Sequence, residues 1–566
     1  MKKLFVYPVL LLAGIFLATW LISGCGNSKN NNEMELKEFI KKFEAKYIPL
    51  VKEAAIASWN AETSGNEAEY EKAADLEFKV SLIFANKEDF ATLKKFKEAK
   101  DIKDPLLLRQ LEILYNGYLG EQIDSVKTKK MIDQQSKISQ AFNTFRPVVG
   151  KDTLTDNKVN SILRSSTDSK MLEATWNATK KSGALVSAQI IELVKMRNEA
   201  AVELGFKNYH EMSLKLSEQD PNEIEKLFNE LDSLTRNSFA QLKGEMDEYF
   251  AKRYKIKTSE LMPWHYQNRF FQEAPNIYPV DLDVYYKDKD VVKVTQDYYN
   301  GIGMPIDDML KNSDMYERKG KNQHAFCTDI DRSGDVRVLC NSKNNANWMN
   351  TNLHEFGHAS YSKFNDRELP YMLRDAAHTF TTEAIAMIFG RLNSNPQWMK
   401  TNLNISDAEV KKIEADCYKT LRLEQLTFSR WAQVMYRFEK SMYENPDQDL
   451  NKLWWDLVEK YQMLKRPADR NQPDWASKIH IALYPCYYHN YLMGELLASQ
   501  FTYYIAKNIY KTEDIKTIDF SKNPEIGKYF IDKVFKPGMR YPWNEMIEKA
   551  TGEKLTAKYY AKQFVD

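Results

Sequence analysis

Glycine and proline are scarce in this chain of 566 residues, which has 20 of the first and 18 of the second. No stretch rich in proline, glycine and serine interrupts it, so the sequence shows no linker between separate domains, although the length alone would allow two or more. Charged residues alternate with apolar ones at helical spacing over most of the chain. Capping sequences at Asp220-Pro221-Asn222-Glu223 and Ser406-Asp407-Ala408-Glu409 mark two helix starts. We predict a large, mainly α-helical protein with one folded domain at 35–566.

An excess of charge of one sign is also absent. Lysine and arginine number 80 against 79 aspartates and glutamates, which leaves a net charge of +1. The chain therefore has no broad electrostatic field that would attract a polyanion. We expect no nucleic-acid partner, and nothing in the sequence indicates a protein partner.

A long apolar run stands near the N-terminus, from Leu4 to Ile22. Two lysines precede it and small residues lead to Cys25, a pattern typical of a secretory signal with a lipobox. An uncleaved membrane anchor is the alternative, because the run is nearly long enough to span a bilayer. We interpret 1–24 as a lipoprotein signal peptide and 25–34 as the lipidated cysteine with a flexible tether. This predicts an extracytoplasmic, membrane-anchored lipoprotein of a bacterium.

Cysteine is rare, and four cysteines remain once Cys25 is set aside. Cys327 and Cys340 lie in two strand-like segments on either side of Asp331-Arg332-Ser333-Gly334, which predicts a β-hairpin. If the turn centres on Ser333-Gly334, these two cysteines face each other, and the pairing permits a disulfide. We expect Cys417 and Cys486 to be free thiols.

The stretch Leu353-His354-Glu355-Phe356-Gly357-His358-Ala359 has the pattern H-E-x-x-H. On an α-helix, His354 and His358 stand one turn apart on one face, so both imidazoles can bind one zinc ion. Glu355 then lies beside the metal, where it can take a proton from an activated water and pass it to the leaving amine. The motif therefore predicts hydrolysis of peptide bonds.

A catalytic zinc needs a third protein ligand and an open position for water. Our candidate is Glu383, in the helical run Thr382-Glu383-Ala384-Ile385-Ala386-Met387-Ile388-Phe389. A carboxylate among so many apolar neighbours is expected to be buried, and a buried acid requires a cation. A surface carboxylate is the alternative.

Four tyrosines and two histidines crowd the stretch 478–491. A positioned phenol or imidazole can stabilise the negative charge that hydrolysis builds on the carbonyl oxygen. The alternative is an aromatic helix start that packs in the core. The N-terminal half, from Glu35 to Leu261, has no catalytic group of residues, and we expect it to form a wall or lid.

Several motifs follow one another along the chain: the pair His324-Ala325, the segment His354 to His358, Glu383, and the cluster of Lys478, His480 and tyrosines. Their order resembles the angiotensin-converting-enzyme family of zinc peptidyl-dipeptidases. Weaker similarity covers residues 40 to 560. The stretch 485–491 is also similar to the thimet and oligoendopeptidase family. The resemblance implies an almost wholly helical ellipsoid, divided by a deep substrate cleft, with a small β-hairpin beside the zinc helix and the active site within 320–500.

The resemblance also implies a role for individual residues. One zinc ion per chain would be bound by His354, His358 and Glu383, with Glu355 as the general base. His480 and Tyr491 would hold the oxyanion. The substrate would be bound by His324 and the backbone of Ala325, and its terminal carboxylate by Lys478, Tyr487 and Gln267.

This chain departs from the family pattern at several positions. One extra residue separates His480 from the final tyrosine, so Tyr488 competes with Tyr491 for the oxyanion. Met387 stands where the family has an aspartate that supports the zinc site, so that support must be built differently. The arginines that bind chloride in animal enzymes are replaced by Val458, by Tyr488 or His489, and by Lys180 or Lys181. We expect activity that is independent of chloride.

The sequence thus predicts a zinc peptidase that releases C-terminal dipeptides from oligopeptides. A zinc carboxypeptidase or oligoendopeptidase is a second interpretation. A third is a lipoprotein that binds peptides without cutting them, which the presence of Glu355 argues against.

Overall fold

The computed structural model describes residues 7–278 and 280–565, with side chains from residue 32 onward. Within these ranges the protein is mainly helical and has two small antiparallel sheets of two strands each. The predicted mainly α fold is confirmed. The helix starts predicted at Asp220 and Ser406 are also confirmed, since both side chains cap the helices that follow them.

The elements follow one another in a simple order. The N-terminal helices are α1 (Tyr7–Ser64), α2 (Glu67–Phe84), α3 (Lys87–Ala99) and α4 (Pro105–Gly120). Next come α5 (Ser125–Thr144), β1 (Val148–Val149), β2 (Asp152–Thr153), α6 (Asp156–Ser165), α7 (Ser169–Glu203), α8 (Tyr209–Leu216) and α9 (Pro221–Tyr254). The middle of the chain forms α10 (Asp283–Tyr286), α11 (Val291–Gly301), α12 (Asp307–Asn312), β3 (Phe326–Asp329), β4 (Val336–Leu339), α13 (Ala346–Lys363) and α14 (Thr379–Gly390). The last helices are α15 (Pro396–Leu403), α16 (Asp407–Glu444), α17 (Leu450–Leu457), α18 (Ile479–Leu483), α19 (His489–Ile505), α20 (Pro524–Phe530), α21 (Trp543–Thr551) and α22 (Lys558–Phe564).

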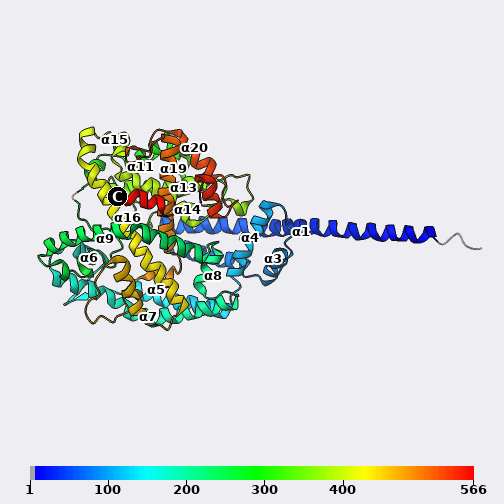
Figure 1. The fold of residues 1–566 in the computed structure, drawn as a ribbon, viewed down its shortest axis with the longest axis horizontal. Helices are drawn as coiled ribbons and strands as arrows, with labels where there is room; N and C mark the ends of the chain where they lie inside the picture. The colour runs from blue at the N-terminus through cyan, green and yellow to red at the C-terminus, as the bar shows by residue number, and fades with distance from the viewer. Residues whose placement is uncertain (1–6, 279, 566) are drawn as a thin grey trace, which may run out of the picture.

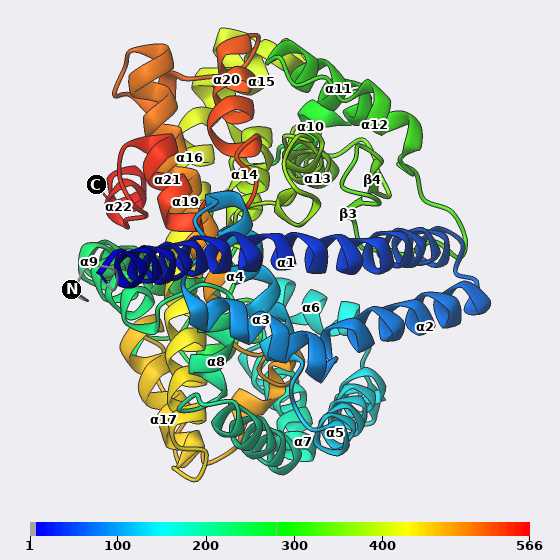
Figure 2. The same ribbon diagram turned by 90° about the vertical axis from the view of Figure 1, so that its right-hand side faces the viewer.

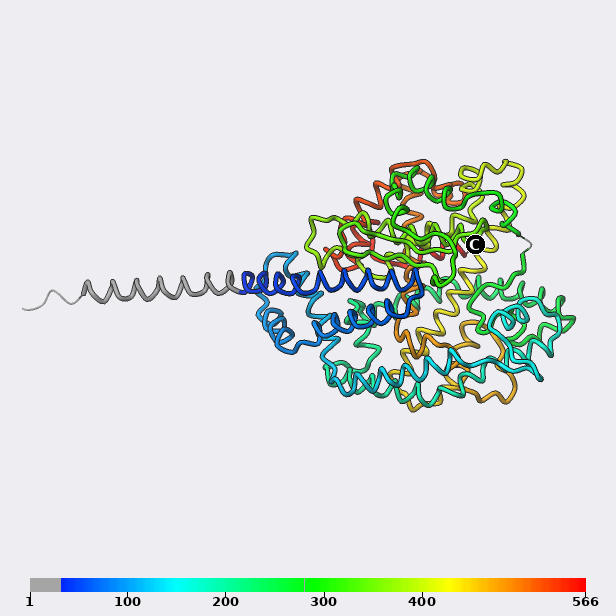
Figure 3. Tube along the Cα trace, turned by 180° about the vertical axis from the view of Figure 1, so that it is seen from behind, coloured from blue at the N-terminus to red at the C-terminus, as the bar shows by residue number. Residues whose placement is uncertain are grey.

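The helices form two groups, which Figures 1 and 2 show one above the other. The upper group contains α10 to α15 and α20 to α22, and the lower group contains α5 to α9 and α17. Helix α1 runs between them across one face. Helix α16, of 38 residues, passes from the upper group to the lower one (Figure 3) and packs against α9 and α19. Both groups share one continuous apolar core, which extends from α5 to α22.

The N-terminal helices have a smaller apolar cluster of their own. It joins α1, α3 and α4 to Tyr371 and Met372, in a short 3-10 helix (Tyr371–Leu373) that precedes α14. Near its C-terminal end, α1 also contacts the hairpin region, where the Glu62 carbonyl accepts the backbone N–H of Asn322 at 2.8 Å and Lys52 pairs with Asp331 at 3.0 Å. These helices therefore rest against the segments that flank the predicted site, and their role as a wall or lid stays a prediction.

The predicted hairpin exists as β3 and β4, but its register differs from our expectation. Cys327 pairs with Val338, and Cys340 lies beyond the strand pairing. The loop has four residues, because the Ile330 N–H bonds to the Asp335 carbonyl and the Asp331 side chain accepts the N–H groups of Ser333 and Asp335. The disulfide is not formed, and Cys327, Cys340, Cys417 and Cys486 are all free thiols. The last two were predicted to be free.

The predicted signal peptide and the lipidation site Cys25 fall outside the described side chains and stay predictions. The whole predicted tether, 25–34, belongs to α1, and the side chains of residues 32–34 are described. They are fixed to the body, because Asn32 donates to Asp101 at 2.8 Å and Glu33 accepts the N–H of Lys103 at 2.6 Å. Within the described part of the chain, no helix combines the length and apolar character needed to cross a bilayer.

Candidate active site

Helix α13 carries the H-E-x-x-H motif, as predicted. The helix begins after Asn345, whose side chain accepts the N–H of Trp348 and so caps the first turn. His354 and His358 stand one turn apart with ring centroids separated by 4.9 Å. Glu355 points into the protein and is 8% exposed.

Helix α14 brings Glu383 to these histidines. One oxygen of its carboxylate, Oε2, lies 3.8 Å from Nε2 of His354 and 3.8 Å from Nε2 of His358. The two helices cross closely because α13 has a glycine at the crossing: a Cβ on Gly357 would lie 2.9 Å from Cα of Ala386. The N-terminus of α14 is fixed by His378, whose ring accepts the N–H of Phe380.

These three side chains fit a zinc ion. Zinc bonds of about 2.1 Å in a tetrahedral site place the ligand atoms about 3.4 Å apart. The two observed separations of 3.8 Å are slightly larger, and all three ligand atoms lie within 4.8 Å of one another. Two imidazole nitrogens and one carboxylate oxygen form a typical catalytic zinc set. The His354 side chain is 28% exposed and that of Glu383 18%, so the set is within reach of solvent.

Burial prepares the ligands electrostatically. It lowers the pKa of His354 to about 4 and that of His358 to about 3, so both rings are neutral at pH 7 and can offer a lone pair. Burial also raises the pKa of Glu383 to about 7. A carboxylate that is this poorly solvated gains stability from a bound cation, as expected from its apolar flanks.

Glu355 has the environment of a proton-transfer group. Burial and, to a smaller extent, the charge of Glu383 together raise its pKa to about 8. A cation beside the two carboxylates would act in the opposite direction and bring the pKa toward neutrality. A group with a pKa near the operating pH is suited to accept and release a proton.

The support for His358 comes from a residue that the sequence analysis did not single out. Its Nδ1 lies 2.8 Å from the hydroxyl oxygen of Thr382. Met387, at the position of the family's aspartate, instead packs against Gly494 of α19, where its sulfur would lie 3.2 Å from an added Cβ. The prediction that this chain builds its support differently agrees with these contacts.

The tyrosines of the stretch 487–491 lie in two different surroundings. Tyr487 and Tyr491 lie with ring centroids 5.2 Å apart, and after burial the charge of Glu383 is the next cause of their raised pKa values. Tyr488 is buried against Trp431, with centroids 6.0 Å apart. Of the two tyrosines that competed for the oxyanion, Tyr491 is therefore the one on the side of Glu383.

His480 lies next to this cluster, with its ring 5.3 Å from that of Tyr488. Its Nδ1 is buried and has no hydrogen-bond partner among the described residues. Burial lowers the pKa of His480 to about 4, so the ring is neutral at pH 7. A neutral imidazole with one nitrogen unused can bind a substrate atom.

Lys478 lies in an aromatic surrounding. Its ammonium is 5.3 Å from the ring centre of Tyr488, and it also lies over the rings of Phe270 and Trp431. It donates a hydrogen bond of 2.6 Å to Gln272. Burial lowers the pKa of Lys478 to about 8, which still leaves the ammonium charged at neutral pH.

Gln272 was missed by the sequence analysis, which named Gln267 in the same loop. The Gln267 side chain accepts the backbone N–H of Asn276 at 2.9 Å and is 7% exposed, so its carbonyl oxygen supports the loop itself. Nothing in the sequence around these two glutamines indicates that Gln272, rather than Gln267, contacts Lys478.

His324 is exposed, and its backbone N–H bonds to the side chain of Asn322. Ala325 comes directly before β3, which packs on α13. Among the described residues β3 pairs only with β4, so its other edge can accept an extended peptide. The structure thus places Ala325 directly before a strand that packs on the zinc helix, with the exposed His324 one residue earlier.

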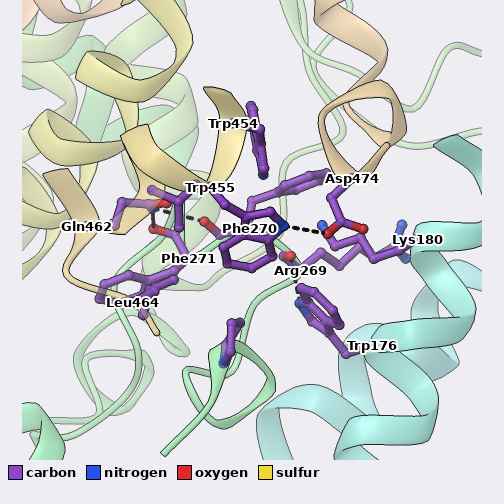
Figure 4. Close-up of a pocket in the computed structure, with 12 residues that line it drawn as sticks. Trp176, Lys180, Arg269, Phe270, Phe271, Trp454, Trp455, Gln462, Leu464 and Asp474 are labelled. Atoms are coloured by element: carbon purple, nitrogen blue, oxygen red, sulfur yellow. Dashed lines mark hydrogen bonds between the residues drawn. The ribbon is translucent and has the colours of Figure 1, made fainter. Parts of the chain in front are cut away.

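Two of the positions compared with chloride-binding arginines line the small pocket in Figure 4, whereas Tyr488 and His489 are not among its lining residues. Val458 and Lys180 line it, whereas Lys181 is exposed. The Lys180 ammonium lies 3.4 Å from the ring centre of Phe270. Asp474 adds a negative charge nearby, and it accepts a hydrogen bond of 3.1 Å from the Trp455 indole (Figure 4).

Comparison with known proteins assigns the chain to a family. The family model described as angiotensin-converting enzyme, Peptidase_M2, matches residues 30–564. The chain is 22% identical to the angiotensin-converting enzyme of Mesocricetus auratus over 572 residues, which cover 92% of this chain and 42% of that protein. It is 24% identical to that of Mus musculus over 410 residues, with 67% and 31% covered, and 22% identical to that of Sus scrofa over 567 residues, with 92% and 42% covered. The chain spans less than half the length of these relatives. The match confirms the resemblance inferred from the motifs: this chain belongs to the angiotensin-converting enzyme family of peptidases.

Proposed function

We propose that this protein is a zinc-dependent peptidyl-dipeptidase that removes dipeptides from the C-terminus of oligopeptides. The observation that carries the proposal is the convergence of His354, His358 and Glu383, with Nε2–Oε2 separations of 3.8 Å, next to the buried Glu355. A zinc ion, when bound there, supplies Lewis-acid activation of water and of the scissile carbonyl.

Glu355 is the proposed general base and acid. It takes the proton of the attacking water and gives it to the amine of the departing dipeptide, so that the leaving group departs neutral. Its burial supports this role, because a poorly solvated carboxylate binds a proton readily.

His480 and Tyr491 are the proposed donors to the oxyanion. Tyr491 lies on the side of Glu383, and the His480 ring packs next to the same cluster, 5.3 Å from the ring of Tyr488. Both groups are neutral donors held in place by packing, which is the arrangement that stabilises a developing negative charge at little reorganisation cost.

Lys478 is the proposed anchor for the terminal carboxylate, with Tyr487 and Gln272 as further candidates. The ammonium lies near the proposed oxyanion donor Tyr491: the rings of Tyr491 and Tyr488 are 5.4 Å apart between centroids, and the ring centre of Tyr488 lies 5.3 Å from the ammonium. Two residues of extended peptide span about 7 Å. In the proposed role, a chain held by its C-terminus at Lys478 would present its second peptide bond, counted from that end, to Glu355.

An oligoendopeptidase is the second candidate, because the space does not end at Lys478. Lys478 and Gln272 line a cavity of about 370 Å³ whose other walls include residues of α5, α6 and α7. A substrate that continued past the ammonium would enter this cavity and be cut further from its end.

We also propose that the protein acts outside the cytoplasm and is attached to a membrane through a lipidated Cys25. The support is the N-terminal sequence alone, in which a basic start and an apolar run lead to small residues before the cysteine. Metabolic labelling with a fatty acid, compared with a Cys25→Ala variant, tests this part.

The enzymatic proposal is tested with protein that lacks residues 1–25. Metal analysis should find one zinc per chain, and a chelator should abolish hydrolysis of an oligopeptide. The Glu355→Gln variant should keep its zinc and lose activity by about 10²- to 10⁴-fold. Wild-type protein that holds zinc and cleaves no peptide would instead favour the peptide-binding lipoprotein.

A further inference from the structure

We propose that Thr382 is a positioning residue of the metal site, which holds the His358 ring through a neutral hydroxyl where the family uses a carboxylate. The inference rests on the proposed zinc site, and it concerns how this chain replaces the missing aspartate at Met387.

The geometry assigns the two nitrogens of His358 to different tasks. Nε2 faces the carboxylate of Glu383 at 3.8 Å and belongs to the ligand set. Nδ1 points the other way and lies 2.8 Å from Oγ1 of Thr382. When the Nε2 lone pair is used by a cation, the ring proton must sit on Nδ1. The imidazole N–H then donates to the threonine oxygen, and this hydrogen bond fixes both the tautomer and the orientation of the ring.

The hydroxyl is held firmly enough to do this. Thr382 directly precedes Glu383 on α14, so one helix supplies both a ligand and the support of another ligand. Its β-branched side chain has few rotamers on a helix. The contact of Gly357 with Ala386 fixes the distance between α13 and α14, and the cap at His378 fixes where α14 begins.

Nothing else in the described structure takes this role. Among the described residues, the contact with Thr382 is the one hydrogen bond found to either zinc-motif imidazole. The Met387 side chain lies one turn beyond Glu383 and packs on α19 at Gly494, and no hydrogen bond joins it to His358 among the described residues. It also has no hydrogen-bonding group of comparable strength, since a thioether is a weak acceptor.

A hydroxyl and a carboxylate do not have the same effect on the metal. Both orient the ring, but a carboxylate also adds a negative charge and makes the imidazole a stronger donor. With Thr382 in this role, Glu383 and Glu355 are the carboxylates identified at the site. The Thr382 hydroxyl therefore contributes only the orientation of the His358 ring. Removing the hydroxyl should remove this orientation without changing the charge of the site.

The test compares three variants of the chain. Thr382→Val has nearly the same shape and loses the acceptor, whereas Thr382→Ser keeps it. Thr379→Val is the matched control, because Thr379 lies in the first turn of the same helix and is exposed. Zinc affinity is measured by competition with a chromogenic chelator, the absorption spectrum is recorded after replacement of zinc by cobalt(II), and unfolding of the metal-free protein shows whether each variant folds.

We expect Thr382→Val to bind zinc about 10- to 100-fold more weakly and to change the cobalt spectrum, while its metal-free form unfolds at the wild-type temperature. Thr382→Ser and Thr379→Val should match the wild type in both measurements. Wild-type zinc affinity in Thr382→Val would overturn the proposal, and so would a Thr382→Ser variant as weak as Thr382→Val. Wild-type protein that binds no zinc would refute the proposed function as well, whereas one that binds zinc without cleaving peptides would leave the role of Thr382 intact.

Discussion

Gly357 sets how closely the two zinc helices approach, and its replacement by alanine should separate them. The added Cβ would lie 2.9 Å from Cα and 3.2 Å from N of Ala386, and 3.3 Å from the carbonyl oxygen of Ile385. All three are backbone atoms of α14, so no side chain can turn aside. Because carbon atoms pack at about 3.5–4.0 Å, the helices must move apart by roughly 0.5–1 Å.

The expected energies come from two opposing effects. Overpacking of this size costs about 1–3 kcal/mol, whereas alanine is better than glycine inside a helix by about 1 kcal/mol. The metal-free Gly357→Ala variant should therefore lose about 0–2 kcal/mol of folding stability. Zinc binding has no such compensation, because the movement carries Glu383 away from both imidazoles. We expect zinc affinity to fall roughly 10-fold, equivalent to about 1.4 kcal/mol.

Gly244 provides the matched control. It lies inside α9, and a Cβ there would meet nothing within 4 Å. Gly244→Ala should therefore gain about 0.5–1 kcal/mol and bind zinc like the wild type. Denaturant unfolding of the metal-free proteins and zinc competition with a chelator measure both quantities. A Gly357→Ala variant that binds zinc normally and is stabilised as much as Gly244→Ala would refute the reasoning.

Three further predictions follow from the surroundings of the site. Because burial lowers the pKa of Lys478 to about 8, its ammonium is charged below that pH and neutral above it. KM for a peptide with a free C-terminus should therefore rise above pH 8. A Lys478→Met variant whose KM shows the same rise would contradict the role of Lys478 as the carboxylate anchor. Chloride should not change the rate at fixed ionic strength, because Val458 has no charge and burial lowers the pKa of Lys180 well below its usual value, which disfavours the cation that an anion would need. A several-fold response would show that an anion site exists. Glu383→Gln should lose zinc, since a neutral amide is a poorer ligand than a carboxylate, and metal analysis showing a full zinc complement at wild-type affinity would exclude Glu383 as a ligand.

The local parts of the site could be predicted from the sequence. Spacing of four residues on a helix is enough to place His354 and His358 on one face, and apolar flanks are enough to mark Glu383 as buried. The structure agrees with the first, and Glu383 is partly buried, with 18% of its side chain exposed. These features depend on neighbours a few residues away, so a single sequence contains the information.

Contacts between distant segments could not be predicted in the same way. Gln272 meets Lys478 across 206 positions of the chain, and Thr382 meets His358 because a glycine lets two helices cross closely. The hairpin shows a third limit: its register depends on which loop residues the Asp331 side chain caps, and a shift of one residue in the turn moved Cys327 away from Cys340.

The most direct test of the central claim is the mass spectrum of the products from one oligopeptide with a free C-terminus and from its amidated twin, each with a chelator control. The account predicts stepwise release of dipeptides from the free end, resistance of the amidated peptide, and loss of all cleavage with chelator. Internal cuts in both peptides would contradict it and identify an oligoendopeptidase, and release of single residues would identify a carboxypeptidase.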